Sequence, residues 1–284
     1  MAEYPTHNGS NHSQLDKHMS PDEALRKIQT SGSIAISPEL FEKLYLSPQN
    51  KVKGELRKTF ANPTPIGLIG FITCLGPLAC DLMGWRGAGE LGAASIPCFF
   101  FFGGVLMITG GLLEFFLGNT FSAVVFFTFG GFWLSLGGTL LPQFGAYAAY
   151  APADAVSPAA GLKTQGFNAS FGFFILSMTM LCFVFLICAL RTNIVYVIIF
   201  TTLTLTAGFI TGAYWAMAAD YAANAAFAER LLVAAGACSF VTTACGWWLL
   251  LGIMLASVDF PLALPVGDLS TVIRGASERR KSAV

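Results

Sequence analysis

Six long apolar runs, separated by mostly short connections, constrain this chain more than any other feature of its sequence. They extend over Pro65–Met83, Ile96–Leu117, Thr120–Leu141, Phe167–Leu190, Ile194–Met217 and Leu231–Val258. Each is close to the roughly 20 residues that a helix needs to cross the hydrocarbon core of a bilayer. Only 11% of the residues are charged, whereas a soluble domain carries roughly 25%. The sequence therefore predicts an all-α integral membrane protein with six transmembrane helices.

Two polar tails frame a predicted transmembrane domain at residues 61–258. Residues 1–60 are rich in Ser, Asn, His and Pro, which is typical of a largely disordered tail. Within it, residues 38–46 predict a short amphipathic helix, which would lie on the membrane surface or dock on the bundle. Its apolar face consists of Leu40, Phe41, Leu44 and Tyr45. Residues 259–284 form the second tail, and the first apolar run begins too late for a signal peptide.

Lys and Arg residues gather on one side of the predicted topology. Eight precede the first run, four lie in the second tail, and Arg191 lies in a connection on the same side. The opposite side carries three, namely Arg86, Lys163 and Arg230. Because cytoplasmic segments carry the excess of basic residues, we expect both termini in the cytoplasm. We expect the plasma membrane, since no retention signal is found, with a vacuolar or other internal membrane as the alternative.

Enzymatic, metal and nucleotide chemistry find little support in the residues. The three histidines all lie in the first tail, and the seven cysteines form no C-x-x-C pair and behave as small apolar fillers. We therefore expect no metal site, no cofactor and no nucleic-acid partner. The stretch GAGELG at Gly87–Gly92 matches a dinucleotide fingerprint, but that fingerprint requires a preceding strand, so we interpret it as a tight turn. No nucleophile–base arrangement lies in the apolar runs, so we expect no enzyme.

Two acidic residues lie inside the apolar runs, where an ionisable group is costly and usually marks a path or a partner. We interpret Asp81, at the end of the first run, as a solvated boundary residue. Glu114 precedes a turn at Gly118 and Asn119, just before Thr120 starts the third run. Two roles stay open for Glu114. It accepts hydrogen bonds at this turn and at the start of the third helix, or it handles protons or substrate.

Glycine and threonine patterns predict which helix faces pack closely. Glycine pairs recur seven residues apart at Gly103/Gly104 and Gly110/Gly111, and at Gly130/Gly131 and Gly137/Gly138. This spacing predicts smooth seams on the second and third helices. In the fifth run, a packing face is predicted from Gly208, Gly212, Thr201, Thr204 and Thr211. Thr202, Leu203 and Thr206 point the other way and would suit a narrow, partly polar path, unless the threonines bond only their own backbone.

The first apolar run begins behind two prolines. Pro63 and Pro65 bias Asn62 and Thr64 away from helical dihedral angles, so the helix should begin at about Pro65. Asn62 and Thr64 would then present polar groups to a vestibule at the edge of the membrane. Gly67 would let a neighbouring helix come close.

At these residues the chain resembles the microbial acetate uptake transporter family. NPTPIGL at residues 62–68 is similar to the family's Asn-Pro-x-Pro-hydrophobic-Gly-Leu signature. Residues 101–135 resemble its second block, with a Gly-Gly, a Glu, an Asn-Thr-Phe and a Gly-x-Phe-Trp. RTN at residues 191–193 and VDFPLALPVGDLS at 258–270 look like fungal members. The family includes bacterial acetate–succinate permeases and fungal plasma-membrane proteins linked to acetate uptake or ammonia export.

The resemblance implies a six-helix protomer with a substrate path through its own bundle, and a homo-oligomer, which is a hexamer in bacterial relatives. It also implies a constriction of Phe, Tyr and Leu, which align with Phe71, Phe129 and Leu203. Phe129 stands where many relatives carry Tyr, Met107 where they commonly carry Gln, and Leu113 where some carry Trp. These departures predict a more apolar path, open to a monocarboxylate larger or less polar than acetate.

We therefore expect a transporter of acetate and similar short-chain monocarboxylates. Such an acid has a pKa of about 4 to 5, and a bare anion at mid-membrane costs several kcal/mol, so we expect it to cross with a proton. The remaining path and motif residues are Asn62, Pro63, Thr64, Pro65, Gly67, Glu114, Asn119, Thr120, Phe121, Thr202 and Thr206. The alternatives are an ammonia or ammonium exporter, and an acid-stress sensor or scaffold that acts through the N-terminal tail.

Overall fold

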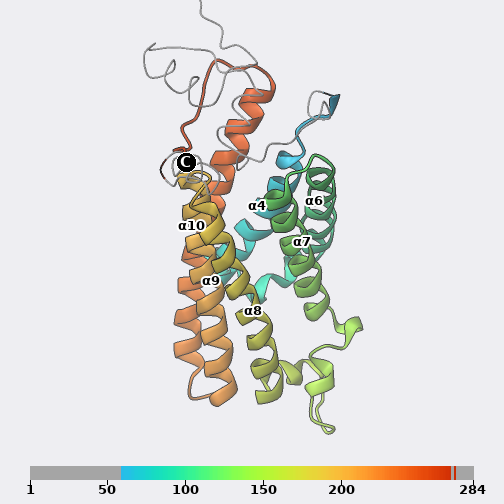
Figure 1. Ribbon diagram of the computed structural model, residues 1–284. Helices are drawn as coiled ribbons and strands as arrows, with labels where there is room; N and C mark the ends of the chain where they lie inside the picture. Colours follow the sequence, from blue (N-terminus) through green and yellow to red (C-terminus); the bar gives the residue numbers. More distant parts are fainter. Residues whose placement is uncertain (1–58, 270–271, 273–284) are drawn as a thin grey trace, which may run out of the picture.

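The computed structural model describes residues 59–269 and residue 272, and helices dominate this part of the chain (Figure 1). Six of its helical segments are long and apolar enough to cross a membrane. This confirms the predicted all-α fold with six spans. The predicted amphipathic segment at residues 38–46, almost all of the first tail and most of the second lie outside the described residues.

The six spans follow the apolar runs closely. They are α4 (Thr64–Leu82), a second span built from α5 (Ile96–Cys98), η3 (Phe99–Leu106) and α6 (Met107–Phe116), then α7 (Thr120–Leu140), α8 (Gln165–Ala189), α9 (Ile194–Ala219) and α10 (Ala225–Ser257). The predicted limits hold to within two residues except at α10, which begins at Ala225 instead of Leu231. With 33 residues, α10 rises by about 50 Å, which exceeds the roughly 30 Å hydrocarbon core. Its first turns therefore carry the exposed, charged Glu229 and Arg230 without breaking the helix.

The middle of the second span is a π-helix, η3, which the sequence did not predict. Such wide turns are rare and often lie at functional sites. Here η3 packs against α7, where a Cβ atom at Gly103 or Gly104 would overlap Trp133 or Leu134. The first half of the predicted glycine seam is therefore a place of close helix contact.

The bundle has two ends that differ in content. The start of α4 and the end of α10 lie at the same end, at the top of Figure 1, which we call the tail end. The connection after α7 lies at the opposite end, which we call the loop end. That connection forms three short helical turns: η4 (Pro142–Phe144), η5 (Ala148–Tyr150) and η6 (Pro158–Lys163).

At the tail end, two motifs that are distant in sequence lie side by side. Asn193 and Asp268 form an isolated β-bridge, and the Ile194 N–H donates to the Gly267 carbonyl at 2.8 Å. Asn193 also caps α9, because its Oδ1 accepts from the Tyr196 N–H at 2.9 Å. The RTN motif and the segment after α10 thus pack together at the start of α9.

Pro77 lies inside α4 and leaves a carbonyl without its helical donor. The thiol of Cys98 donates to this carbonyl, that of Thr73, at 3.4 Å. The thiol of Cys74 donates to the Cys98 carbonyl, also at 3.4 Å. These two cysteines therefore supply hydrogen bonds between the first two spans, beyond the filler role expected of them.

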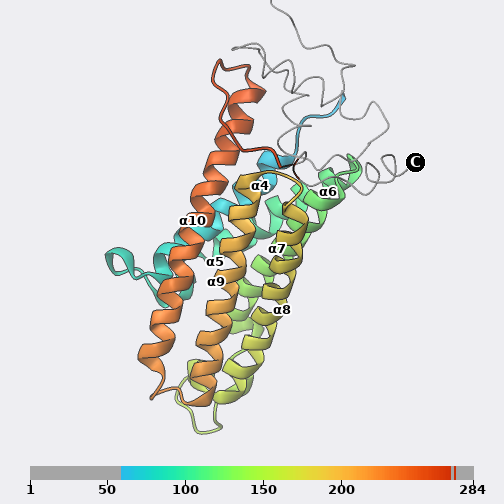
Figure 2. The same cartoon turned by 60° about the vertical axis from the view of Figure 1, so that its left-hand side comes forward.

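The segment between α4 and α5 consists of η1 (Trp85–Gly87) and η2 (Glu90–Ser95), which project from the side of the bundle (Figure 2). Gly87 and Gly92 have positive φ angles of 84° and 80°. The GAGELG stretch follows a helix and not a strand, so it is a turn, as interpreted from the sequence.

Candidate functional site

The three predicted constriction residues come together in the bundle. Phe71 on α4, Phe129 on α7 and Leu203 on α9 are buried and line one cavity of about 50 Å³, which we call the ring cavity. The rings of Phe71 and Phe129 meet edge to face with centroids 5.7 Å apart. All three helices begin at the tail end, and these residues follow their helix starts by seven to nine positions. They therefore share a depth of roughly 10 to 14 Å along the bundle.

The wall of the ring cavity is apolar apart from Trp133, Thr206 and Ser239. Its other members, besides the ring itself, are Leu75, Leu78, Leu82, Phe132, Ile175, Met178, Cys182, Ala207 and Ile210. No Asp, Glu, Lys, Arg or His is among the residues that line it. A buried space of this composition disfavours a bare ion and tolerates a small neutral molecule.

A second cavity, also of about 50 Å³, continues from the first toward the loop end. The two share the lining residues Leu78, Leu82, Phe132, Ile175 and Ile210. The second cavity then reaches Leu162, which precedes α8, and Tyr214 near the end of α9. Small spaces thus follow one another from the ring to the loop end.

On the tail-end side of the ring, aromatic side chains pack against one another. Phe121 near the start of α7 contacts Phe185 and Phe200, with ring centroids 6.2 and 6.0 Å apart. Phe185 also lies 6.4 Å from the ring residue Phe129. The structure thus places the predicted path residue Phe121 in an aromatic cluster next to the ring, on the side opposite the cavities.

Glu114 is fully buried, with 0% of its surface exposed, and two side chains donate to its carboxylate. These are the hydroxyl of Thr64 and the side-chain amide of Asn119. The three residues, which we call the Glu114 latch, tie the start of α4 to the turn between α6 and α7. Of the two residues between Gly118 and Phe121, Asn119 takes part, whereas Thr120 is exposed. Glu114 is not among the residues that line the ring cavity.

The start of α4 differs from the prediction in one residue. The helix begins at Thr64, and the preceding Pro63 already has near-helical angles, with φ −84° and ψ −12°. The Thr64 N–H donates to Oδ1 of Asn62 at 2.9 Å, and the Ile66 N–H donates to the Pro63 carbonyl at 3.0 Å. These bonds outweigh the bias that Pro65 imposes on Thr64, and proline itself suits the first helical turn.

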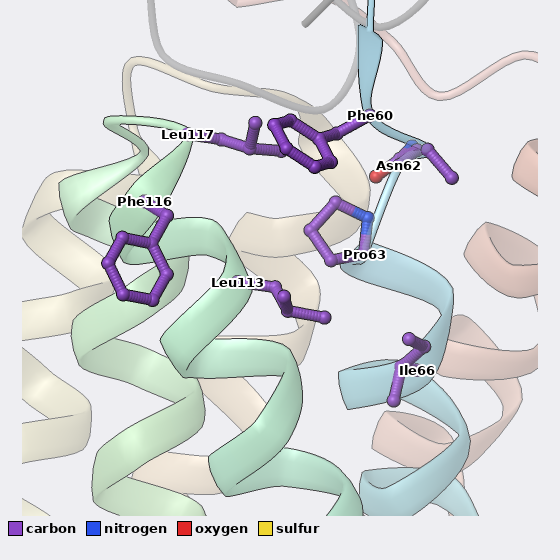
Figure 3. A pocket seen from close by; sticks show the side chains of 8 residues that line it. Phe60, Asn62, Pro63, Ile66, Leu113, Phe116 and Leu117 are labelled. Carbon is purple, nitrogen blue, oxygen red and sulfur yellow. The ribbon is translucent and has the colours of Figure 1, made fainter. Parts of the chain in front are cut away.

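The vestibule beside this helix start is apolar, so the prediction of a polar one was wrong. A groove of about 420 Å³ lies between the start of α4 and the end of α6 (Figure 3). Its lining consists of Phe60, Ala61, Asn62, Pro63, Ile66, Leu113, Phe116 and Leu117. Of the two polar side chains predicted to face it, Asn62 lines the groove while its Oδ1 accepts from the Thr64 N–H, and Thr64 is absent from the lining because its hydroxyl bonds Glu114.

Gly67 allows the close approach that its sequence position predicted. A Cβ atom at Gly110 on α6 would lie 2.9 Å from the Gly67 nitrogen and 3.0 Å from its Cα. A Cβ atom at Gly67 would lie 2.6 Å from the ring of Phe126. Helices α4, α6 and α7 therefore touch almost backbone to backbone directly below the latch.

The threonines of α9 divide between two roles. Thr204 and Thr211 donate to carbonyls of their own helix. The hydroxyl of Thr202 lies 2.6 Å from that of Thr242, and the hydroxyl of Thr206 lies 3.2 Å from that of Ser239. The predicted hydroxyl face of α9 thus meets a hydroxyl face of α10, and its Thr206 reaches the ring cavity.

The packing face predicted from Gly208 and Gly212 is looser than a close glycine contact. The nearest atoms to a Cβ at these positions would be 3.9 and 3.4 Å away, at ordinary contact distance. The close glycine contact of α10 is with α4, because a Cβ at Gly246 would lie 2.5 Å from Ile72. Ser239 was not predicted, although Ser239, Thr242, Thr243 and Gly246 recur at helical spacing.

Fold and site together define a six-helix membrane protein with two small, apolar cavities in its bundle. Comparison with known proteins gives the family: the chain belongs to the GPR1/FUN34/yaaH family, whose model matches residues 45–271. The bacterial acetate channel SatP has a similar solved structure, with a TM-score of 0.55 at 26% identity. The match covers 73% of this chain and 99% of SatP.

Among the curated relatives, some are named as transporters of acetate or of ammonia, and another has a name that states no activity. The chain is 48% identical to Protein alcS of Aspergillus fumigatus, over 84% of this chain and 86% of that protein. It is 30% identical to the acetate transporter protein patA of Aspergillus clavatus, over 74% of this chain and 78% of patA. It is also 30% identical to the ammonia transport outward protein 2 of Saccharomyces cerevisiae, over 52% of this chain and 48% of that protein. The named activities are transport, and none is enzymatic.

Proposed function

We propose that this chain conducts acetate and similar short-chain monocarboxylates across a membrane, through its own bundle and together with a proton. The observation that carries the proposal is the ring of Phe71, Phe129 and Leu203 around a cavity without a charged lining residue. The similarity of the chain to an acetate transporter and to an acetate channel supports the substrate class.

The proton follows from the chemistry of the ring. An acid with a pKa of about 4 to 5 is almost entirely anionic at neutral pH. An anion in the middle of a membrane costs several kcal/mol by the lower, insertion-based scales, and phenyl and isobutyl groups offer it no donor. The neutral acid avoids this cost, so the species that passes the ring carries its proton.

Orientation, location and assembly are parts of the same proposal. Both tails face the cytoplasm, which the distribution of Lys and Arg favours. The plasma membrane is the proposed location, since the fungal proteins that the chain resembles are found there. The resemblance to bacterial relatives supports a hexamer in which every protomer has its own path.

The test is uptake of labelled acetate by transporter-deficient yeast that express the full chain, at pH 5 and pH 7. We expect saturable uptake that is faster at pH 5, because the neutral fraction of such an acid falls roughly 50- to 100-fold between these values. Leu203→Trp should abolish it, since an indole cannot fit beside Phe71 and Phe129. Leu205→Trp is the matched control, because Leu205 lies on the same helix with 47% of its surface exposed. Equal saturable uptake at both pH values would reject proton linkage.

Ammonia export is the second candidate, because ammonia is also small and neutral and a relative carries that name. The same cells decide between the two. Ammonium release that is sensitive to Leu203→Trp, without saturable acetate uptake, would favour export. A sensor or scaffold would tolerate Leu203→Trp in signalling but lose its output when residues 1–36 are deleted.

A further inference from the structure

Trp133 holds a buried hydrogen-bond donor with no partner. Its indole is 1% exposed, and its Nε1 is the buried side-chain nitrogen or oxygen that lacks a hydrogen bond among the described residues. Buried donors in proteins are nearly always paired, and an exception calls for a reason. A ligand that is present only part of the time is one such reason.

The position of Trp133 points to such a ligand. It lies four residues, or about one helical turn, beyond Phe129 on α7 and lines the ring cavity. Phe99 stacks on the indole with centroids 5.0 Å apart, Phe132 contacts it at 5.3 Å, and Gly103 packs against its base. These contacts hold the indole in place beside the cavity.

Two hydroxyl groups line the same cavity at nearly the same depth. Thr206 lies three residues beyond Leu203 on α9, and Ser239 faces it from α10. The Thr206 hydroxyl donates to the Ala235 carbonyl at 3.3 Å, and the two hydroxyls lie 3.2 Å apart. When Ser239 donates to Thr206, both protons are used and the Ser239 oxygen keeps free lone pairs. Trp133, Thr206 and Ser239 thus place one donor, one acceptor and no charge among the residues around the cavity.

We propose that Trp133 and the Thr206–Ser239 pair form a subsite that binds the uncharged form of the carboxylic acid as it passes the ring. The indole N–H donates to the acid carbonyl, and the Ser239 oxygen accepts the acid O–H. A carboxylate has no proton for Ser239 and finds no cation here, so the subsite selects the neutral form. This inference rests on the proposed function, and it names the groups that recognise the substrate.

The direct test observes the indole N–H groups by NMR in the full chain, labelled with ¹⁵N-tryptophan and held in lipid nanodiscs. Trp133→Phe assigns the Trp133 resonance. Acetate added at pH 5 should shift this resonance downfield in a saturable manner, and the same total acetate at pH 8 should not. The other four tryptophans, Trp85, Trp215, Trp247 and Trp248, are at least 37% exposed and serve as internal controls. Sodium chloride at equal ionic strength is the salt control.

Transport kinetics give the second measurement. Trp133→Phe and Ser239→Ala should each raise the half-saturation concentration of acetate about five- to tenfold at pH 5, the effect of one lost hydrogen bond. Trp247→Phe, on the outer surface of α10, should leave it unchanged. If Trp133→Phe does not fold, Ser239→Ala still decides.

The outcomes separate this inference from the function on which it rests. Saturable acetate uptake with no shift of the Trp133 resonance overturns the subsite and leaves the transport proposal standing. An equal shift at pH 5 and pH 8 also overturns it, because the carboxylate would then be the bound species. Absence of both uptake and shift overturns both proposals.

Discussion

The Glu114 latch and the ring cavity lie in the same bundle but differ in whether their buried polar groups are hydrogen-bonded. The latch contains a fully buried carboxylate, and two donors meet its oxygens. The ring cavity contains no charge, and its one fixed donor, Trp133 Nε1, has no partner in the described structure. Each Glu114 oxygen already accepts a hydrogen bond inside the protein, whereas the Trp133 donor lies unpaired in the wall of a cavity. Glu114, although it is a buried charged residue in the spans, therefore need not lie on the proposed substrate path.

The two regions also differ in how tightly they are packed. Below the latch, Gly110 and Gly67 bring α6 and α4 together at a distance that excludes even a methyl group. Around the ring, two small cavities remain open between side chains. We infer that the latch region holds the helices in place while the ring region leaves room for passage.

The largest expected effect comes from forcing apart the helices below the latch. Gly110→Leu would place a side chain against the backbone of Gly67, which cannot move aside without displacing α4. We expect the protein to lose its monodisperse peak in size-exclusion chromatography after detergent extraction. Gly131→Leu is the matched control from the neighbouring seam, because a Cβ there meets no atom within 4 Å. If Gly110→Leu behaved like this control, the close approach of α4 and α6 would be refuted.

The next largest effect is expected from Glu114 itself. Glu114→Ala removes the acceptor of both Thr64 and Asn119 and leaves two buried donors, which should lower the free energy of unfolding by about 2 to 4 kcal/mol. Glu114→Gln keeps the shape and one acceptor oxygen, so its loss should be smaller. Thermal unfolding of the purified variants measures this.

The same two variants decide between the roles left open for Glu114. If the latch is structural, acetate uptake per folded molecule keeps its pH dependence in Glu114→Gln. A flattened pH profile with unchanged thermal stability would instead assign Glu114 to proton handling. The latch would then be part of the transport machinery, and its structural role would no longer distinguish it from the ring.

The sequence predicted the frame of this molecule well because apolar length and glycine spacing are local properties. Six apolar runs correspond to six spans, and Gly67 correctly predicted a close helix contact. What it did not reveal depends on contacts between distant residues. The Thr64 hydroxyl bonds Glu114 across 50 positions of sequence, so Thr64 does not line the vestibule that was expected to be polar.

Two further features were hidden for related reasons. The π-helix η3 has the same apolar composition as an α-helix, so periodicity cannot distinguish them. Trp133 was visible in the sequence as part of a motif, but an unpaired donor is a property of the space around it. Ser239 could have been found, since hydroxyl and small residues form a stripe on α10.

The smallest expected effect comes from a substitution in the ring itself. Phe129→Tyr adds one hydroxyl beside a cavity that offers it room and the polar neighbours Thr206 and Ser239. We therefore expect a change in unfolding free energy of about 1 kcal/mol or less, with a shift of roughly two- to fivefold in the uptake ratio of acetate to butyrate in favour of acetate. Competition between labelled acetate and unlabelled butyrate measures the ratio, and Phe127→Tyr, on the exposed side of α7, is the control. An unchanged ratio in Phe129→Tyr would mean that the ring sieves by size alone, and that selection for polarity falls to the groups beyond it.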